Sequence, residues 1–280
     1  MVGAGISCGV DSLSTIYDHF VKENDEDYKI NALFLFNCGT HGDYENSKTL
    51  ELYEKRYELN KRAADEMGLP VYQVNSNLHA FTHQIGEQRV GFFAIWSCIF
   101  ALGNAIKKYY VSSSNEYEEI KTYSKFMKDF DMAEFCESYL VPLIRTESLE
   151  LIIDGCQYRR TQKTRNIADW KIAQKYLNVC INSKDGTNCS RCSKCMRTLI
   201  PLEAMGKLDR FSDTFNLDIY RKYQSRWKHY FVANTRKQGY AEDIVTYCRA
   251  HGYSMPLRVI AVSYMFLWRC ATFFKRKLKS

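Results

Sequence analysis

The first half of the chain alternates between two patterns of apolar and polar residues. Short, mostly apolar runs, typical of strands buried on both faces, occur at 2–6, 30–36, 71–74 and 109–112. Between them lie segments with helical spacing at 12–22, 47–67 and 92–106. Strands separated by helices favour right-handed crossovers, so we expect an α/β fold with a doubly wound parallel sheet.

The second half of the chain shows no such alternation. Residues 113–139 are irregular and rich in Tyr, Glu and Lys, which predicts a long insertion. Residues 146–180 are predicted to be helical, and so is most of the chain after Lys207. The sequence therefore predicts three segments, namely an α/β domain at 1–165, a smaller segment at 166–206 and a helical C-terminal extension at 207–280.

The composition is that of a folded globular protein, with 46% hydrophobic and 25% charged residues. The formal net charge of +7 only weakly favours polyanionic partners such as nucleic acid. There are 11 cysteines, an odd number, and no basic and apolar leader opens the chain. We therefore expect a reducing, cytoplasmic location, in which clustered cysteines are first interpreted as metal ligands.

Two apolar stretches resemble membrane spans, but neither predicts one. Residues 90–106 are uncharged but short for a span and contain Gly, Ser and Asn, which favours a buried helix. Residues 259–268 lie between two arginines and are too short to cross a bilayer. This second stretch either packs on its own domain or lies on an anionic membrane surface.

The first predicted strand is followed by the turn Ser7-Cys8-Gly9-Val10-Asp11-Ser12. A tight strand-to-helix turn directs several backbone N–H groups and a helix N-terminus at one point, which suits a phosphate group. Ser7 and Ser12 can donate to phosphate oxygens, whereas Asp11 would hold Mg²⁺ or cap the helix. A Walker A loop is excluded because its Lys is missing, and a dinucleotide fingerprint is excluded by Cys8. A plain N-terminal helix cap remains the alternative.

Cys8 occupies a position where a side chain is a liability if the backbone needs a positive φ. We favour a tolerated substitution. The alternative is a thiol whose pKa is lowered by the helix N-terminus, which would make it sensitive to oxidation or nucleophilic.

Four cysteines form the pattern C-x8-C-x2-C-x2-C between residues 180 and 195. Four thiolates so close together suit a closed, structural zinc site, with an iron–sulfur cluster as the alternative. The predicted metal ligands are Cys180, Cys189, Cys192 and Cys195.

These two motifs together carry a resemblance to a known family. The turn at 7–12 resembles the SGGxDS loop of the PP-loop ATP pyrophosphatases. Followed by the cysteine pattern, it is similar to the 7-cyano-7-deazaguanine synthase family of queuosine biosynthesis. The resemblance covers roughly the first 205 residues and includes shorter stretches at 37–41, 141–144 and 147–152.

The resemblance implies an adenine nucleotide alpha hydrolase-like fold and an ATP-dependent C–N ligase. Such an enzyme adenylates a small carboxylate or carbonyl oxygen with release of pyrophosphate, and ammonia then displaces AMP to give an amide or nitrile. ATP, Mg²⁺ and Zn²⁺ are the expected cofactors, and an ammonia donor and a homodimer are possible partners. The implied catalytic residues are Asp11, Ser12 and Lys163, and the implied nucleotide-binding residues are Ser7, Cys8, Gly9, Val10, Asp11, Ser12, Phe36, Asn37 and Arg165.

Two neighbouring arginines, Arg159 and Arg160, are further candidates for binding phosphate or an anionic substrate. For this whole basic stretch, a solvated helix face is about equally plausible. Two other functions stay open: a PP-loop enzyme that modifies tRNA, and a non-catalytic zinc protein that binds nucleotides or nucleic acid.

Overall fold

The computed structural model of the chain describes residues 1–39, 47–82, 84–85, 87–118, 137–181 and 186–277. These residues form two compact units. Unit 1 consists of 1–178 with 183–187, and unit 2 consists of 179–182 with 188–280.

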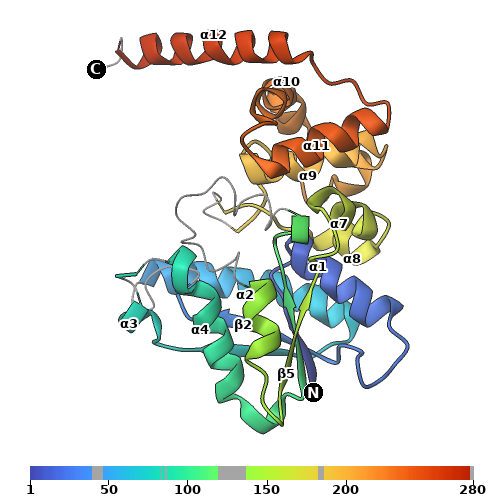
Figure 1. Cartoon of the computed structure of the whole chain (residues 1–280), viewed down its shortest axis with the longest axis vertical. Helices are drawn as coiled ribbons and strands as arrows, with labels where there is room; N and C mark the ends of the chain where they lie inside the picture. The colour runs from blue at the N-terminus through green and yellow to red at the C-terminus, as the bar shows by residue number, and fades with distance from the viewer. Residues whose placement is uncertain (40–46, 83, 86, 119–136, 182–185, 278–280) are drawn as a thin grey trace. The chain divides into compact units, whose positions relative to one another are not determined.

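Unit 1 is an α/β structure around a five-stranded parallel sheet with the strand order β3-β2-β1-β4-β5 (Figure 1). Gly3 on β1 pairs with Ala32 on β2 and with Tyr109 on β4. The chain therefore adds strands first on one side of β1 and then on the other. The strands are β1 Val2–Gly5, β2 Ala32–Asn37, β3 Val71–Asn75, β4 Lys108–Ser112 and β5 Glu150–Asp154.

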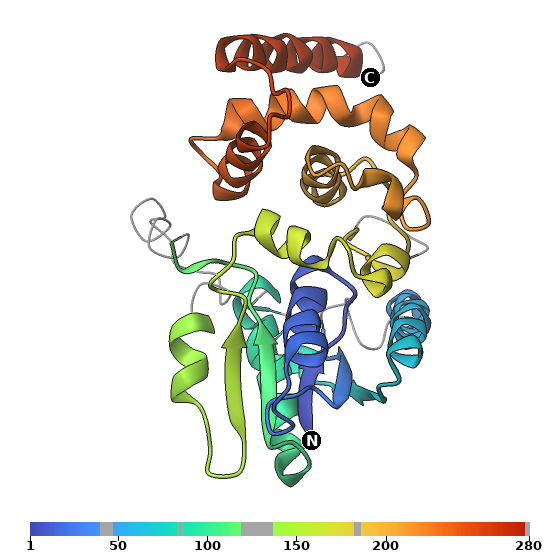
Figure 2. The same cartoon turned by 90° about the vertical axis from the view of Figure 1, so that its right-hand side faces the viewer.

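The helices of unit 1 connect these strands, and Figure 2 shows them beside the sheet. The helix predicted at 12–22 is helical from Val10 to Lys22, its second half being a π-helix. The helical segments are α1 Val10–Ile16, η1 Tyr17–Lys22, α2 Ser47–Met67, α3 His79–Thr82, α4 Glu87–Ala101, η2 Gly103–Ala105, α6 Glu137–Leu140, η4 Val141–Leu143, α7 Arg160–Ile167 and α8 Lys171–Tyr176.

An aromatic core lies between the sheet and α4. Phe34 and Phe36 on β2 contact Tyr109 on β4, with ring centroids 5.9 and 6.2 Å apart. Because β1 runs between these two strands, it must leave room for their rings. A Cβ atom on Gly3 would lie 2.7 Å from Cε2 of Phe34, so only glycine fits at that position.

The prediction of a continuous helical region over 146–180 is wrong at its beginning. Residues 150–154 form β5, which pairs with β4 in parallel register and places Tyr110 beside Ile152. The residues Leu151, Ile152 and Ile153 are apolar and mostly β-branched, and the exposed edge of β4 supplies hydrogen-bond partners for them. Pairing at the edge of the sheet thus decided the conformation of this segment, because its apolar residues do not by themselves distinguish a strand from a helix.

Unit 2 is helical and packs α9, α10 and α11 around a small apolar core. Its largest buried side chains include Phe211, Tyr220 and Phe231. The helical segments are α9 Ser193–Ala204, η5 Leu208–Phe211, α10 Leu217–Asn234, α11 Gly239–Ala250 and α12 Arg258–Lys277.

The observed division of the chain differs from the three predicted segments with boundaries at 165 and 206. Helices α7 and α8 belong to unit 1, because α7 packs on α1 and α8 packs on α2. The cysteine-rich segment belongs to unit 2, because α9 continues directly from it and packs on α10 and α11. Among the described residues, no helix is both long enough and apolar enough to cross a membrane.

Candidate functional site

The turn after β1 presents one polar face and one buried face. Ser7 is exposed, and Gly9 and Asp11 are partly exposed. Cys8 and Val10 alternate with them and are buried. The helix α1 begins at Val10 with Gly9 as its N-cap, and no side chain caps it. Asp11 therefore does not have the capping role that the sequence offered as one alternative.

The two serines of the turn hold it closed. The hydroxyl oxygens of Ser7 and Ser12 are 3.0 Å apart, and the Ser12 hydroxyl donates to the carbonyl oxygen of Gly9 at 3.3 Å. The backbone N–H of Gly9 in turn donates to the Ser7 hydroxyl at 3.3 Å. Both predicted hydroxyl donors thus lie at the N-terminus of α1, where the helix dipole favours an anion.

Cys8 has a φ of 51°, which is the left-handed backbone conformation in which a side chain is unfavourable. Its side chain is only 1% exposed, so it does not occupy the polar face of the turn. Its carbonyl oxygen accepts from the N–H of Asn178 at 2.7 Å, which helps to hold this backbone. Burial raises the pKa of the Cys8 thiol to about 12, so the alternative of a nucleophilic, low-pKa thiol is wrong.

Asp11 is the charged centre of the site. Its carboxylate forms an ion pair with Arg160, and its Oδ1 lies 3.4 Å from Nζ of Lys163. Burial alone would raise the pKa of Asp11, but the two cations outweigh burial and hold the pKa below its ordinary value. One carboxylate with two cations leaves a net positive charge beside the turn, which favours binding of a phosphate over binding of a metal cation.

Lys163 is only 1% exposed and lies against residues that directly follow β4 and β5. Its ammonium group donates to the carbonyl oxygen of Ser113 at 2.7 Å, just after β4. Gly155, just after β5, has a φ of 87°, and a Cβ atom there would lie 3.1 Å from both Cε and Nζ of Lys163. The sequence did not single out Ser113 or Gly155; a glycine directly after a strand was the available signal, but β5 had not been predicted.

The strand order explains why residues so distant in sequence meet. Since β4 lies between β1 and β5, the turns that follow β1 and β5 emerge near one another at the carboxyl edge of the sheet. The turn after β5 leads into α7, which packs on α1. This packing brings Arg160 and Lys163 to Asp11.

Three of the predicted nucleotide-binding residues lie outside the turn. Arg165 is exposed on the side of α7 opposite Lys163, and Arg160 takes the place beside the turn. Phe36 is buried in the aromatic core. Asn37, at the end of β2, is fully buried, and its Nδ2 donates to Oδ1 of Asn75 at 3.1 Å. Part of the family-like stretch at 37–41 lies outside the described residues.

A second acidic residue near this edge was missed by the sequence reasoning. Oδ2 of Asp154 accepts from the Thr15 hydroxyl at 2.7 Å, and Oδ1 lies 3.2 Å from Nε2 of His19. Burial would raise the pKa of Asp154, but the contacts with His19 and Thr15 lower it overall. Because the His19 ring also stacks on Tyr110, we interpret this cluster as a brace between α1, η1 and the sheet.

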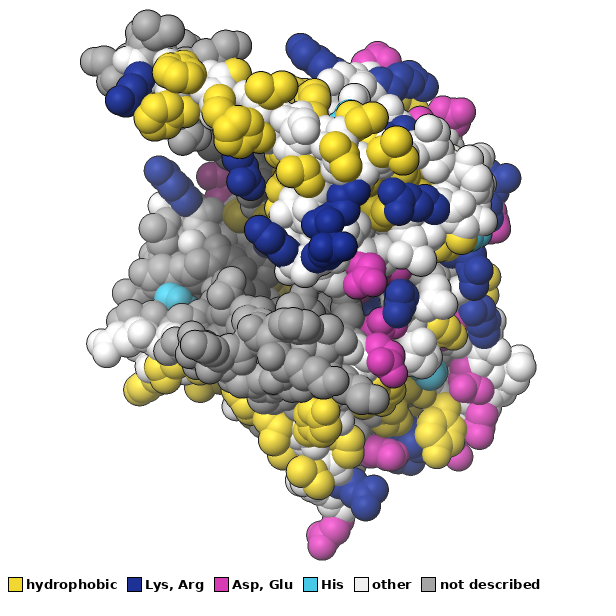
Figure 3. All heavy atoms as spheres, turned by 45° about the horizontal axis from the view of Figure 1, so that its top comes forward, with side chains coloured by type: hydrophobic (Ala, Val, Ile, Leu, Met, Phe, Trp, Pro, Cys, Tyr) yellow, Lys and Arg dark blue, Asp and Glu magenta, His cyan; other side chains and the backbone are white. Residues whose placement is uncertain are grey.

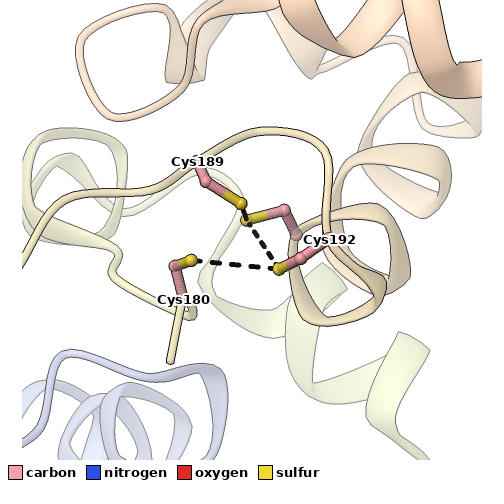
Figure 4. Close-up of side chains that lie close together, drawn as sticks. Cys180, Cys189 and Cys192 are labelled. Carbon is pink, nitrogen blue, oxygen red and sulfur yellow. Dashed lines mark hydrogen bonds between the residues drawn. The ribbon is translucent and has the colours of Figure 1, made fainter. Parts of the chain in front are cut away.

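The four predicted metal ligands come together in unit 2. Their sulfur atoms all lie within 4.8 Å of one another, and they form a group that can hold a metal ion such as zinc. The separations are 3.9 Å for Cys180 and Cys192, 3.9 Å for Cys189 and Cys195, and 3.5 Å for Cys192 and Cys195. A tetrahedral ion with metal–sulfur bonds of about 2.3 Å separates its ligands by about 3.8 Å, which matches these distances. Figure 4 shows the thiols of Cys180, Cys189 and Cys192 pointing toward one another.

The local backbone accounts for this convergence. Ser190 is buried with φ of 54°, which turns the chain sharply between Cys189 and Cys192. Asn188, next to Cys189, holds the residue before Cys180 in place, because its Oδ1 accepts from the N–H of Val179 at 2.9 Å. Its Nδ2 also donates to the carbonyl oxygen of Thr214 at 3.0 Å.

Two of the cysteines lie at the start of α9. Cys192 is the N-cap residue of the helix and Cys195 is in its first turn. The hydrogen bond with Cys195 lowers the pKa of the Cys192 thiol to about 4, and the pKa of Cys195 is correspondingly raised. A lowered thiol pKa favours the thiolate, which is the form that binds metal.

Neither a model of a known protein family nor a curated protein matches this chain.

Proposed function

We propose that this chain is an ATP-dependent C–N ligase of the PP-loop type with an adenine nucleotide alpha hydrolase-like, doubly wound fold. In this reaction a carboxylate oxygen of a small substrate attacks the α-phosphorus of ATP, and pyrophosphate leaves. Ammonia then attacks the acyl carbon, AMP leaves with the carboxylate oxygen, and an amide and a proton remain. To give a nitrile, a second ATP would adenylate the amide oxygen with release of pyrophosphate, and AMP would then leave with that oxygen and a proton would be lost.

The observation that carries the proposal is the pair of cations held by Asp11 beside the N-terminus of α1. Pyrophosphate gains charge as it leaves, so cations fixed in advance beside it lower the barrier. Arg160 has a planar guanidinium group that can bind two phosphate oxygens at once. Lys163 is buried and already oriented, so its positive charge acts with little reorganisation.

In this proposal the polar face of the turn holds the β- and γ-phosphates. Ser7 and Ser12 supply hydroxyl groups, and Val10 lies where a free N–H group of the first turn of α1 is expected. Because Asp11 already pairs with two cations, it fits the role of positioning them better than the role of holding Mg²⁺. Mg²⁺ would then enter with the nucleotide and neutralise phosphate charge.

Zinc is proposed as the metal of the cysteine group. Four sulfurs within 4.8 Å suit a single ion, whereas an iron–sulfur cluster places several iron and sulfide atoms between its cysteine ligands. Four cysteine ligands leave no open position, which favours a structural role.

The test is release of pyrophosphate and AMP from ATP and Mg²⁺ with ammonium and a panel of deazapurine carboxylates. Arg160→Gln is expected to lower the rate about 100-fold, the cost of removing one transition-state charge partner. Arg165→Gln is the matched control, since it removes the same charge from the opposite side of the same helix and is expected to change the rate less than about twofold.

Calorimetric titration with ATP measures nucleotide binding directly, so it tests the site even when the protein accepts no substrate in the panel. Binding that is weakened by Arg160→Gln and not by Arg165→Gln supports the site. The absence of ATP binding to the folded wild-type protein, or equal weakening by both variants, overturns the proposal.

A further inference from the structure

The C-terminal helix α12 packs on unit 2 with only one of its faces. Ala261 and Met265 are buried against α10, the helix that α12 contacts most. Along the same side, Tyr264 stacks on His229 of α10, and Arg226 of α10 lies 5.2 Å from the ring centroid of Trp268. The sequence left open whether the apolar stretch at 259–268 packs on its own domain, and part of it does.

A second apolar face of α12 is exposed. Val259 is 78% exposed and Phe266 is 66% exposed, although both are large apolar residues. At 100° per residue, most of these exposed positions fall on an arc roughly opposite Ala261 and Met265. Figure 3 shows yellow side chains following one another along this helix. The large exposed apolar residues of α12 outside its packed side are Val259, Ile260, Val262, Phe266, Leu267, Phe273 and Phe274.

The charges of α12 are all of one sign. The helix RVIAVSYMFLWRCATFFKRK contains five Lys and Arg residues and no Asp or Glu. Arg258 and Arg269 are eleven residues apart, so they lie on nearly the same line along the helix, between the packed face and the exposed apolar face. Such a border of long basic side chains can reach outward while the apolar residues beside them are covered.

Neighbouring charges on α10 add to this positive field. Its sequence LDIYRKYQSRWKHYFVAN carries four Lys and Arg residues and one Asp. A second copy of α12 laid on the first would bring two such basic helices together, and like charges would oppose that contact. An anionic surface carries negative charge, which complements the positive charge of α10 and α12.

We propose that the exposed face of α12 binds the surface of an anionic lipid membrane. The helix lies in the plane of the interface, with Phe266, Phe273 and their apolar neighbours among the acyl chains and Arg258 and Arg269 at the phosphate groups. A helix that is apolar on one exposed face and basic along its border has the form expected of such a surface anchor. The proposal does not depend on the activity proposed for unit 1.

Co-sedimentation of the full chain with lipid vesicles tests this proposal. We expect binding to phosphatidylcholine vesicles containing 30% phosphatidylglycerol, at least tenfold weaker binding to pure phosphatidylcholine, and loss of binding in 0.5 M salt. Equal binding to both kinds of vesicle, or binding to neither, overturns the proposal.

Two pairs of variants locate the contact. The double variant Phe266→Ser and Phe273→Ser is expected to weaken vesicle binding at least tenfold, whereas Phe81→Ser and Leu143→Ser, which remove two exposed apolar side chains from unit 1, are expected to leave it unchanged. Likewise, Arg258→Gln and Arg269→Gln are expected to weaken binding about tenfold, whereas Lys55→Gln and Lys61→Gln on α2 change it less than twofold.

Light scattering of the same proteins in solution tests whether a second copy of the chain, and not a membrane, covers the exposed face of α12. If the wild-type chain is a dimer and the Phe266→Ser and Phe273→Ser variant is a monomer, a second copy covers this face and the membrane proposal is overturned. If both have the same mass and the vesicle results hold, the proposal stands.

Discussion

The turn after β1 and the cysteine group of unit 2 are assembled in opposite ways. The four cysteines lie between residues 180 and 195, and one sharp turn with one helix N-terminus brings them together. The charged partners at the turn are far apart in the sequence, since Asp11 meets Arg160 and Lys163 from α7. A local cluster can be recognised from spacing alone, whereas a non-local cluster depends on the order of the strands.

The two sites also differ in what balances their charge. Asp11 pairs with two cations that the protein itself supplies. Four thiolates within 4.8 Å repel one another and need a cation. We therefore expect unit 2 to depend on a bound ion and the turn to depend on its internal ion pairs.

Metal removal is expected to have the largest effect. Structural zinc contributes an apparent binding free energy of about 10–16 kcal/mol in small domains, which equals or exceeds the stability of a typical domain. Cys192→Ser should abolish stoichiometric zinc, measured by elemental analysis, and unfold α9 and the residues around Cys189, measured by hydrogen exchange.

The control for this variant is Cys270→Ser, because Cys270 is a half-buried cysteine of unit 2 outside the metal group. It should retain zinc and normal protection of α9. A Cys192→Ser protein with unchanged metal content and unchanged exchange would contradict a structural metal site.

Removal of the carboxylate at the turn is expected to have an intermediate effect. Asp11→Asn leaves the buried Lys163 without its counter-ion, which should cost about 3 kcal/mol, the low end for a broken buried pair because Asp11 is partly exposed. Urea unfolding measures this loss. Asp218→Asn, at a side chain that is 94% exposed, should cost less than about 0.5 kcal/mol.

The same pair predicts how stability changes with pH. The pKa of Asp11 is lower in the folded than in the unfolded protein, so its contribution is complete above about pH 4 and is lost as the pH falls further. The difference between wild type and Asp11→Asn should therefore shrink below pH 4. A difference that grows in acid would show that Asp11 is not held as a carboxylate.

The smallest expected effect concerns the strained backbone of the turn. Cys8→Gly and Cys8→Ala both remove the thiol, but only alanine keeps the cost of the left-handed conformation, so glycine should be the more stable variant by about 1 kcal/mol. At Cys98, a buried cysteine in α4, the order should reverse, because alanine is preferred in a helix. Equal stability of the two Cys8 variants would argue against strain at this position.

Much of unit 1 could be predicted from the period of its apolar residues. The strands β1 to β4 and the helix α2 lie where the pattern places them, because short apolar runs alternate there with segments of helical spacing. The strand β5 was missed because five residues of mixed pattern carry no clear period, and only pairing with β4 makes them a strand. Missing β5 also concealed Gly155 and the reason why α7 reaches the turn.

The sequence by itself determined the four cysteines that can hold a metal ion and the polar groups of the turn, because both depend on contacts between residues close in the chain. Only the tertiary structure decided that Arg160 rather than Arg165 stands beside Asp11, since the packing of α7 on α1 selects one face of that helix. It also decided that Phe36 belongs to the core and that α12 buries one apolar face and exposes another. Burial and partner choice are properties of packed surfaces, and no single segment contains them.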